Sequence, residues 1–316
     1  MMGTQYRVLV VADQCEDESA QANLHDQLLA EMNRVNAIMS HYIDDSELST
    51  INKAPADQEI ELSPDMAAVM LMSAQIFDAS NGVFDVTLSP VIELWGFGKD
   101  GAVSQQPSEQ ELQQVAETVG FEKLNFLSNS LNKEHSDLQI NLSAIAKGYA
   151  IDAVGELLDR LAFENYMIDI GGELKLSGHN KERGLWRIAI EQPNVLGGIQ
   201  SIISISETAV ATSGDYRNFI ELDGQKYSHT LSSETLSPVL HSLASVTVLH
   251  QSAAMADGFA TAIMAKGEGA GIEFAKQQNL SYYAMVRQEN QGYEVLMSDD
   301  MRRFLVPELD TEPQQE

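Results

Sequence analysis

Segments with the alternation of a β-strand and segments with the spacing of an α-helix follow one another along most of this chain. Tyr6 to Val11 has the pattern of a strand. An amphipathic helix follows and ends near Ser40, with apolar residues at Leu24, Leu28, Met32, Val35 and Met39. Strands and helices in this mixed order, with no repeat or low-complexity linker between them, predict a single α+β unit.

Capping residues mark the starts of other helices. Ser63 as N-cap and Pro64 at the first helical position predict a helix that ends at Gly82. Ser108 and Glu111 form a capping box for a helix that ends near Val119. Three more helices are expected: after a short strand at 139–141 and a turn near Ser143, over 253–265, and over 272–277.

Alternating apolar residues and turn dipeptides predict the strands. Asp223 and Gly224 are expected to form a two-residue hairpin turn. The segment 84–98 is expected to begin as a strand, to turn at Ser89 and Pro90 and to continue as a shaped loop. The other predicted strands are 166–170, 174–176, 186–191, 202–205, 219–222, 225–230, 245–249, 281–287 and 293–297.

The charge of the chain restricts its partners. It has 316 residues, 44% of them hydrophobic, and 19 Lys and Arg against 47 Asp and Glu give a net charge of −28. Such a charge repels nucleic acids and anionic membranes, so an anionic ligand needs a metal ion or a cluster of backbone N–H groups. A single cysteine, Cys15, excludes an internal disulfide, and no apolar run is long enough to span a bilayer.

Two segments offer candidate ligands. Asp257 and Thr261 lie four residues apart in a predicted helix, so both side chains can face one hard cation. Their spacing alone favours an ordinary helix with one polar face. Ala144 to Gly148 lies at a strand-to-helix junction, where backbone groups can meet phosphate and Lys147 adds positive charge; an ordinary helix start with a solvated lysine is the alternative.

His229 is the best placed histidine because it follows a predicted strand. It is a candidate general base, although a strand-edge cap is the commoner role of a single histidine in such a place. The chain has no Gly-x-Ser-x-Gly elbow, Walker loop or His-Glu-x-x-His motif. Gly96 and Gly98 lack the third glycine of a dinucleotide-binding fingerprint.

Together these segments resemble the FAD:protein FMN transferases, the ApbE family of flavin transferases. The resemblance covers nearly the whole chain, in the order of the family. It rests on MGTQYRV at Met2, SHYIDDSELSTIN at Ser40, GVFDVTLSPVIELWGFG at Gly82, LSAIAKGYAID at Leu142, IDIGGELKLSG at Ile168, ATSGDYRNFIELDGQKYSH at Ala211 and ADGFATA at Ala256.

The resemblance implies an activity and a fold. The family moves the FMN half of FAD to a threonine or serine of an acceptor protein and releases AMP, and some members hydrolyse FAD instead. The implied fold is α+β, with mixed, largely antiparallel sheets, flanking helices and a T-fold-like core. One domain over 1–306, with the FAD site between two lobes as an option, would precede an acidic, disordered tail over 307–316.

The resemblance also implies roles for individual residues. Mg²⁺ is expected on the carbonyl of Ala144 and the side chains of Asp257 and Thr261, where it offsets the charge of the pyrophosphate. His229, beside the reacting phosphate, is the candidate base, with Asp257 as the rival. FAD contacts are expected from Met2, Tyr42, Val83, Phe84, Asp85, Asn141, Lys147 and His229.

The chain departs from the family pattern at two places. Asn141 stands where the family usually has Asp, and 232–238 reads Ser-Ser-Glu-Thr-Leu-Ser-Pro where the family usually has Asp-Pro-x-Thr-Gly-x-Pro. An FAD pyrophosphatase and a flavin-binding protein without activity are therefore the alternatives to a transferase. Because family members are often exported lipoproteins, a periplasmic protein trimmed of its lipid anchor is expected, with a cytoplasmic location as the alternative.

Overall fold

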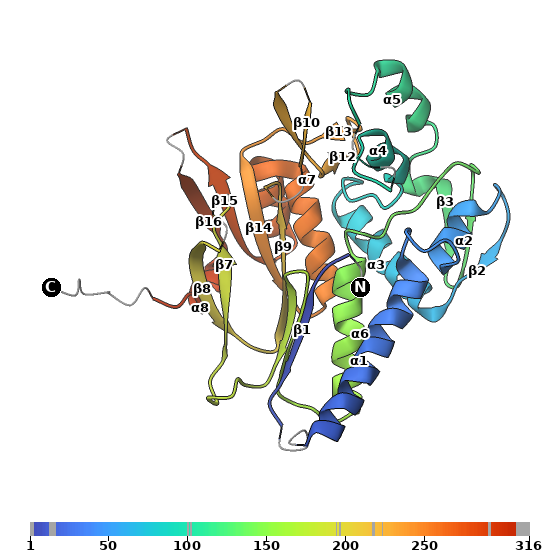
Figure 1. Cartoon of the computed structure of the whole chain (residues 1–316). Helices are drawn as coiled ribbons and strands as arrows, with labels where there is room; N and C mark the ends of the chain where they lie inside the picture. Colours follow the sequence, from blue (N-terminus) through green and yellow to red (C-terminus); the bar gives the residue numbers. More distant parts are fainter. Residues whose placement is uncertain are drawn as a thin grey trace.

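A seven-stranded antiparallel sheet forms the centre of the computed structural model (Figure 1). The structure describes residues 3–12, 17–99, 101, 103–193, 195, 197–216, 219–222, 224–289 and 292–307. In the order of the sheet, its strands are β1 (Tyr6–Val10), β5 (Tyr166–Ile170), β6 (Glu173–Ser177), β9 (Thr208–Gly214), β14 (Leu243–His250), β15 (Ser281–Arg287) and β16 (Tyr293–Met297).

Helices cover one face of this sheet. The helices α6 (Ala146–Arg160) and α7 (Ala253–Gln277) lie against it, and α1 (Glu18–Met39) and α3 (Pro64–Ala79) pack on their outer side (Figure 1). Side chains of these helices and of the facing strands form the main hydrophobic core. This arrangement confirms the predicted α+β class with largely antiparallel sheets and flanking helices.

The opposite face carries a hairpin and a short helix. Strands β7 (Trp186–Glu191) and β8 (Ile199–Ile205) pair with each other, and α8 (Asp299–Phe304) lies beside them. Trp186, Ile203 and Met301 share a second buried cluster with β6 and β15. The central sheet is therefore covered on both faces, and successive residues of its strand β14 are buried.

The remaining elements form two further groups. One group is α2 (Glu47–Lys53) with the sheet β2-β4-β3 (Ile60–Glu61, Ser130–Lys133 and Leu124–Leu127) and a short 3₁₀ helix (Phe121–Lys123). The other has its own apolar cluster around Trp95 and Tyr227. Its elements are α4 (Ser89–Leu94), α5 (Glu109–Ala116), β10 (Phe219–Leu222), β11 (Gln225–Ser228), β12 (Leu231–Ser232) and β13 (Ser237–Pro238). The expected division into one domain and a tail stays a prediction.

The predicted caps are present in the structure. The Ser63 side chain accepts a hydrogen bond from the N–H of Met66, and Ser108 forms the reciprocal capping box with Glu111. All five apolar positions predicted for the first helix are buried. The two helices predicted for 253–265 and 272–277 are the two parts of α7, which are separated at Gly267, where φ is 76°. Asp223 lies outside the described residues, whereas β10 and β11 pair on either side of it.

The strand expected from Phe84 is wrong. Asp85 directs this backbone, because its Oδ1 atom accepts hydrogen bonds from both the N–H and the hydroxyl of Thr87, at 2.7 Å each. A carboxylate bonded to the chain two residues ahead favours a turn over a strand. Ser89 and Pro90, expected to turn the chain, instead begin α4, since proline fits the first turn of a helix.

The short strand expected at 139–141 is also wrong. Both backbone groups of Ile140 bind the side-chain amide of Asn52, with N–H to Oδ1 at 2.7 Å and Nδ2 to the carbonyl at 2.9 Å. The buried ammonium of Lys133 donates to the carbonyls of Asn52, Ser136 and Leu138 at 2.8 to 3.1 Å. Side chains thus satisfy the backbone here, and the segment that leads to α6 is extended without a partner strand.

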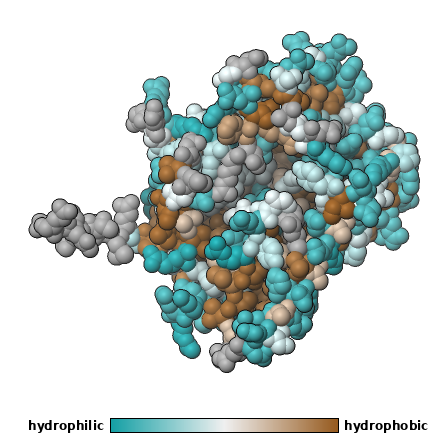
Figure 2. Space-filling view, in the orientation of Figure 1, coloured by the Kyte–Doolittle hydropathy of each residue, from teal (hydrophilic) through white to brown (hydrophobic). Residues whose placement is uncertain are grey.

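Figure 2 shows hydrophilic residues over much of the molecular surface, with hydrophobic patches between them. No helix in the described part of the chain is long and apolar enough to cross a membrane.

We expect Asn52→Ala to lower the free energy of unfolding by about 1 to 3 kcal/mol, because it leaves two backbone groups of Ile140 without their partners. Urea denaturation followed by circular dichroism measures the change. Asn125→Ala is the matched control, since its exposed side-chain amide donates to the Asn132 side chain at the surface, and its effect should stay within about 0.5 kcal/mol. Equal losses in both variants would contradict the role of Asn52.

Candidate active site

A cavity of about 600 Å³ brings together residues from most of the segments that carry the family resemblance. Its volume lies within the usual range of ligand pockets. Met2 lies outside the described residues. All other predicted site residues line this cavity, namely Tyr42, Val83, Phe84, Asp85, Asn141, Ala144, Lys147, His229, Asp257 and Thr261.

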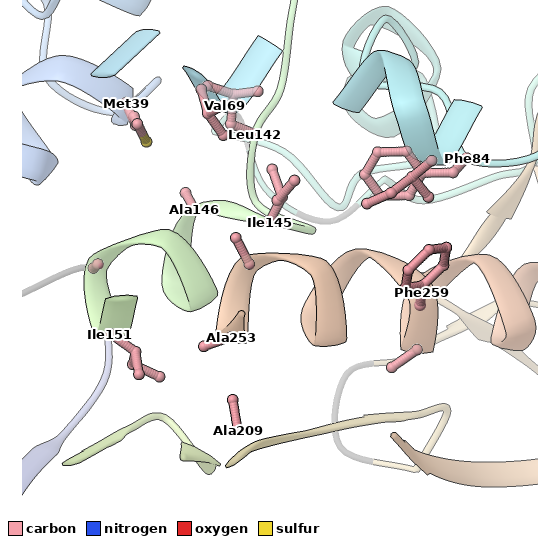
Figure 3. Close-up of a cluster of buried hydrophobic side chains, with 14 of the residues drawn as sticks. Met39, Val69, Phe84, Leu142, Ile145, Ala146, Ile151, Ala209, Ala253 and Phe259 are labelled. Carbon is pink, nitrogen blue, oxygen red and sulfur yellow. The ribbon is translucent and has the colours of Figure 1, made fainter. Parts of the chain in front are cut away.

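The cavity depends on a close contact between the first turns of α6 and α7. A side chain at Gly148 would collide with the carbonyl oxygen of Ala253, so only glycine allows the two helices to come this near. Figure 3 shows Ala146 and Ala253 at the facing ends of these helices. The contact lets the N–H of Gly148 donate to Oδ2 of Asp257 at 3.3 Å.

Lys147 lies between two buried carboxylates. Its Nζ atom is 3.3 Å from Oδ2 of Asp257 and 3.6 Å from Oε1 of Glu173. Asp257 is only 3% exposed and Glu173 only 5%. Burial lowers the pKa of Lys147, but the charges of Asp257 and Glu173 outweigh this effect and leave it above its ordinary value. The ammonium is therefore charged at neutral pH.

Glu173 was not among the residues predicted from the sequence. Gly171 and Gly172, with φ of 71° and 101°, form the turn that places it at the start of β6. Burial raises the pKa of Glu173 to about 7, which the nearby Lys147 opposes. Its Oε2 atom is buried and has no hydrogen-bond partner among the described residues. An acidic residue directly between a Gly-Gly turn and an apolar strand was the available signal in the sequence.

The three residues expected to hold a metal all line the cavity. Asp257 and Thr261 both line the cavity from α7, and Ala144 lines it just before α6. The hydroxyl of Thr261 lies 3.4 Å from that of Ser213. A carboxylate, hydroxyls and a backbone carbonyl are ligands that suit a hard cation such as Mg²⁺. Because no group of three His, Cys, Asp or Glu side chains clusters in the described residues, the metal assignment stays a prediction.

Asn141 and Asp85 brace the walls of the cavity. Oδ1 of Asn141 accepts from the N–H of Ser143 at 2.9 Å, and its backbone N–H donates to the carbonyl of Val86 at 2.7 Å. Asp85 accepts a further bond from the N–H of Phe121. Asn141 thus provides the acceptor oxygen that an aspartate would provide here. Their predicted contacts with FAD stay predictions.

His229 and Tyr42 line more open parts of the cavity. His229 directly follows β11, is exposed, and has its ring edge-on to Phe97 with 6.5 Å between ring centroids. Tyr42 is 60% exposed, and its ring lies 4.0 Å from that of His41. An exposed ring in a cavity wall can stack on a planar ligand.

The segment that departs from the family pattern keeps a defined structure. It forms the β12–β13 hairpin, in which Ser233 donates to the carbonyl of Gly82 at 2.8 Å and the carbonyl of Leu236 accepts from the Trp95 ring at 2.9 Å. Leu236 has φ of 51°, a conformation that favours glycine, and it occupies the position of the glycine in the family pattern. The hairpin therefore tolerates the substitution and still borders the cavity at Leu231.

Comparisons with known proteins identify the family of this chain. The model of the ApbE family matches residues 2–285. The FAD:protein FMN transferase of Haemophilus influenzae is 36% identical over 296 residues, which cover 92% of this chain and 85% of that protein. The enzyme of the same name from Vibrio cholerae is 36% identical over 307 residues, which cover 96% and 90%.

Solved structures give the same result for the fold. The flavin transferase ApbE from Vibrio cholerae superposes with a TM-score of 0.88 at 34% identity over 96% of both chains. The flavinyl transferase ApbE from Pseudomonas stutzeri has a TM-score of 0.87 at 34% identity, over 96% of this chain and 94% of that one. With a family match over nearly its whole length and relatives of the same fold, this chain belongs to the ApbE family.

Proposed function

We propose that this chain is an FAD:protein FMN transferase, which moves FMN from FAD to a threonine or serine of an acceptor protein and releases AMP. One observation carries the proposal. A member of the ApbE family has a single cavity that brings Tyr42, Lys147, His229 and Asp257 together from four separate segments. Its curated relatives carry the name of this activity.

The proposal includes Mg²⁺ on Asp257, Thr261 and the carbonyl of Ala144. When bound, the ion would offset the charge of the FAD pyrophosphate and polarise the phosphorus that is attacked. The protein itself opposes an anionic ligand through its net charge of −28, and only Lys147 contributes a full positive charge among the residues that line the cavity. A bound cation would therefore offset the negative charge that opposes an anionic ligand at this site.

His229 is the proposed general base. In the transfer step, the acceptor hydroxyl oxygen bonds to the phosphorus of the FMN half, and the bond from that phosphorus to the AMP oxygen breaks. The hydroxyl proton passes to the imidazole. Asp257 is the weaker candidate because it is buried and already accepts from Lys147 and from the N–H of Gly148. His229 is exposed and can meet a hydroxyl that arrives from outside.

The exposure of His229 also supports a second candidate function. A water molecule in place of the acceptor hydroxyl would turn the same reaction into hydrolysis of FAD to FMN and AMP. The two activities would therefore differ only in whether an acceptor hydroxyl or a water molecule reaches His229.

An acceptor assay separates these functions. We expect FAD, Mg²⁺ and an acceptor domain with a target threonine to give a covalently yellow acceptor and one AMP per flavin, and a Thr→Ala acceptor to stay unlabelled. In-gel flavin fluorescence and chromatography of AMP measure the products. AMP formed without a labelled acceptor would instead identify an FAD pyrophosphatase, and unchanged FAD would identify a flavin-binding protein.

We expect Asp257→Ala and Asp257→Asn to reduce Mg²⁺-dependent turnover by at least about a hundredfold, because both remove the carboxylate proposed to hold the metal. Asp257→Asn preserves the shape of the buried side chain and so separates loss of charge from loss of packing. Glu156→Gln is the control, since this glutamate has a side chain that is 73% exposed on α6 and is not among the residues that line the cavity. Full rate in both Asp257 variants would show that the ligand assignment is wrong.

His229→Ala tests the base. We expect its transfer rate to fall by about 10² to 10⁴ while its affinity for FAD, measured by flavin fluorescence, changes little. His135→Ala serves as control because this histidine is exposed and is not among the residues that line the cavity. An unchanged rate with a weakened affinity would make His229 a binding residue rather than the base.

A further inference from the structure

Lys147, Asp257 and Glu173 form a cluster of three ionisable side chains at the proposed metal site. When both buried carboxylates are ionised, they and the ammonium together carry one net negative charge in the wall of the cavity. The Lys147 ammonium lies next to the same Asp257 carboxylate that is proposed to hold Mg²⁺. A lysine and a divalent cation at one carboxylate repel each other, so they compete for it.

We infer that Lys147 competes with the metal ion for Asp257 and that Glu173 is the alternative partner which receives Lys147 when the metal binds. This inference rests on the proposed magnesium site. Its geometric basis is the position of Nζ between the two carboxylates, 3.3 Å from one and 3.6 Å from the other. The ammonium therefore lies within ion-pair distance of both carboxylates.

The surroundings of the two carboxylates differ in the way that this exchange requires. Asp257 is fixed by the backbone N–H of Gly148, which stays in place when Lys147 leaves. Glu173 has a buried Oε2 atom with no hydrogen-bond partner in the described residues, so it can accept the N–H groups that Lys147 withdraws from Asp257. A buried acceptor without a hydrogen bond destabilises the folded protein.

The exchange also changes the charge that the cavity presents to an anion. With a divalent cation on Asp257, the three side chains and the ion together carry one net positive charge, in place of one negative charge. A pyrophosphate anion would then meet an attractive site within a strongly acidic protein. Glu173 acts here as a positioning residue, because it works through Lys147 and needs no contact with FAD.

Titration of the FAD-free full chain with Mg²⁺ alone, followed by isothermal calorimetry, tests the inference without any turnover. We expect Lys147→Met to tighten Mg²⁺ binding by about tenfold or more, since it removes a competing cation. Lys147→Gln, which can still hydrogen-bond both carboxylates, should act in the same direction if the methionine variant does not fold. Unchanged or weaker binding in the folded variant would overturn the inference. If the wild type binds no Mg²⁺ at all, binding by the variant would support the inference, and no binding by either would overturn it.

A double-mutant cycle tests the part played by Glu173. We expect Glu173→Gln to weaken Mg²⁺ binding several-fold when Lys147 is present, because the lysine then stays on Asp257, and to have a much smaller effect in Lys147→Met. Equal effects in both backgrounds would mean that Glu173 acts only through its own charge, which contradicts the exchange.

Asp257→Asn separates this inference from the proposed function. Mg²⁺ binding should disappear in this variant whether or not Lys147 competes. If binding persists, the metal lies elsewhere, and both the metal assignment and the competition fail. If binding disappears but Lys147→Met leaves the wild-type affinity unchanged, the metal site stands and only the competition fails.

Discussion

The contact between the first turns of α6 and α7 is the constraint on which the rest of the site depends. Gly148 permits it, and Asp152 of α6 strengthens it by accepting hydrogen bonds from the Ser252 hydroxyl and from the N–H groups of Ala253 and Ala254. One helix thus caps the other. Because each helix also lies on the central sheet, the contact fixes Lys147 and Asp257 relative to β6 before any ligand binds.

This arrangement places positive potential locally within a protein whose overall charge is negative. The N-terminal end of α6 lines the cavity at Ala146 and Lys147 and adds the partial positive charge of a helix N-terminus. Lys147 adds a full positive charge there. Asp257 and Glu173 form ion pairs with this ammonium, and their negative charges offset it. The net charge of these three side chains is therefore small, and one divalent cation is enough to change it from negative to positive.

The sequence predicted what depends on local patterns. Ser63 and Ser108 mark helix starts because their hydroxyls act within one turn, and such signals survive any tertiary context. The errors near Phe84 and Ile140 have the opposite cause, since side chains of Asp85 and Asn52 bind backbone that a local pattern assigns to a strand. The resemblance identified residues that line one cavity. It could not reveal the Lys147–Glu173 pair, because 26 positions of sequence separate two residues that only the sheet and α6 bring together.

The two ends of the cavity differ in exposure, and this difference bears on the choice between transfer and hydrolysis. Asp257 is buried against α6, whereas His229 stands exposed at the end of β11, on the smaller apolar cluster around Trp95. With His229 as the proposed base, a nucleophile is expected to arrive from its side of the cavity. Selection for transfer then lies in how well an acceptor protein covers His229 and excludes water from the reacting phosphorus.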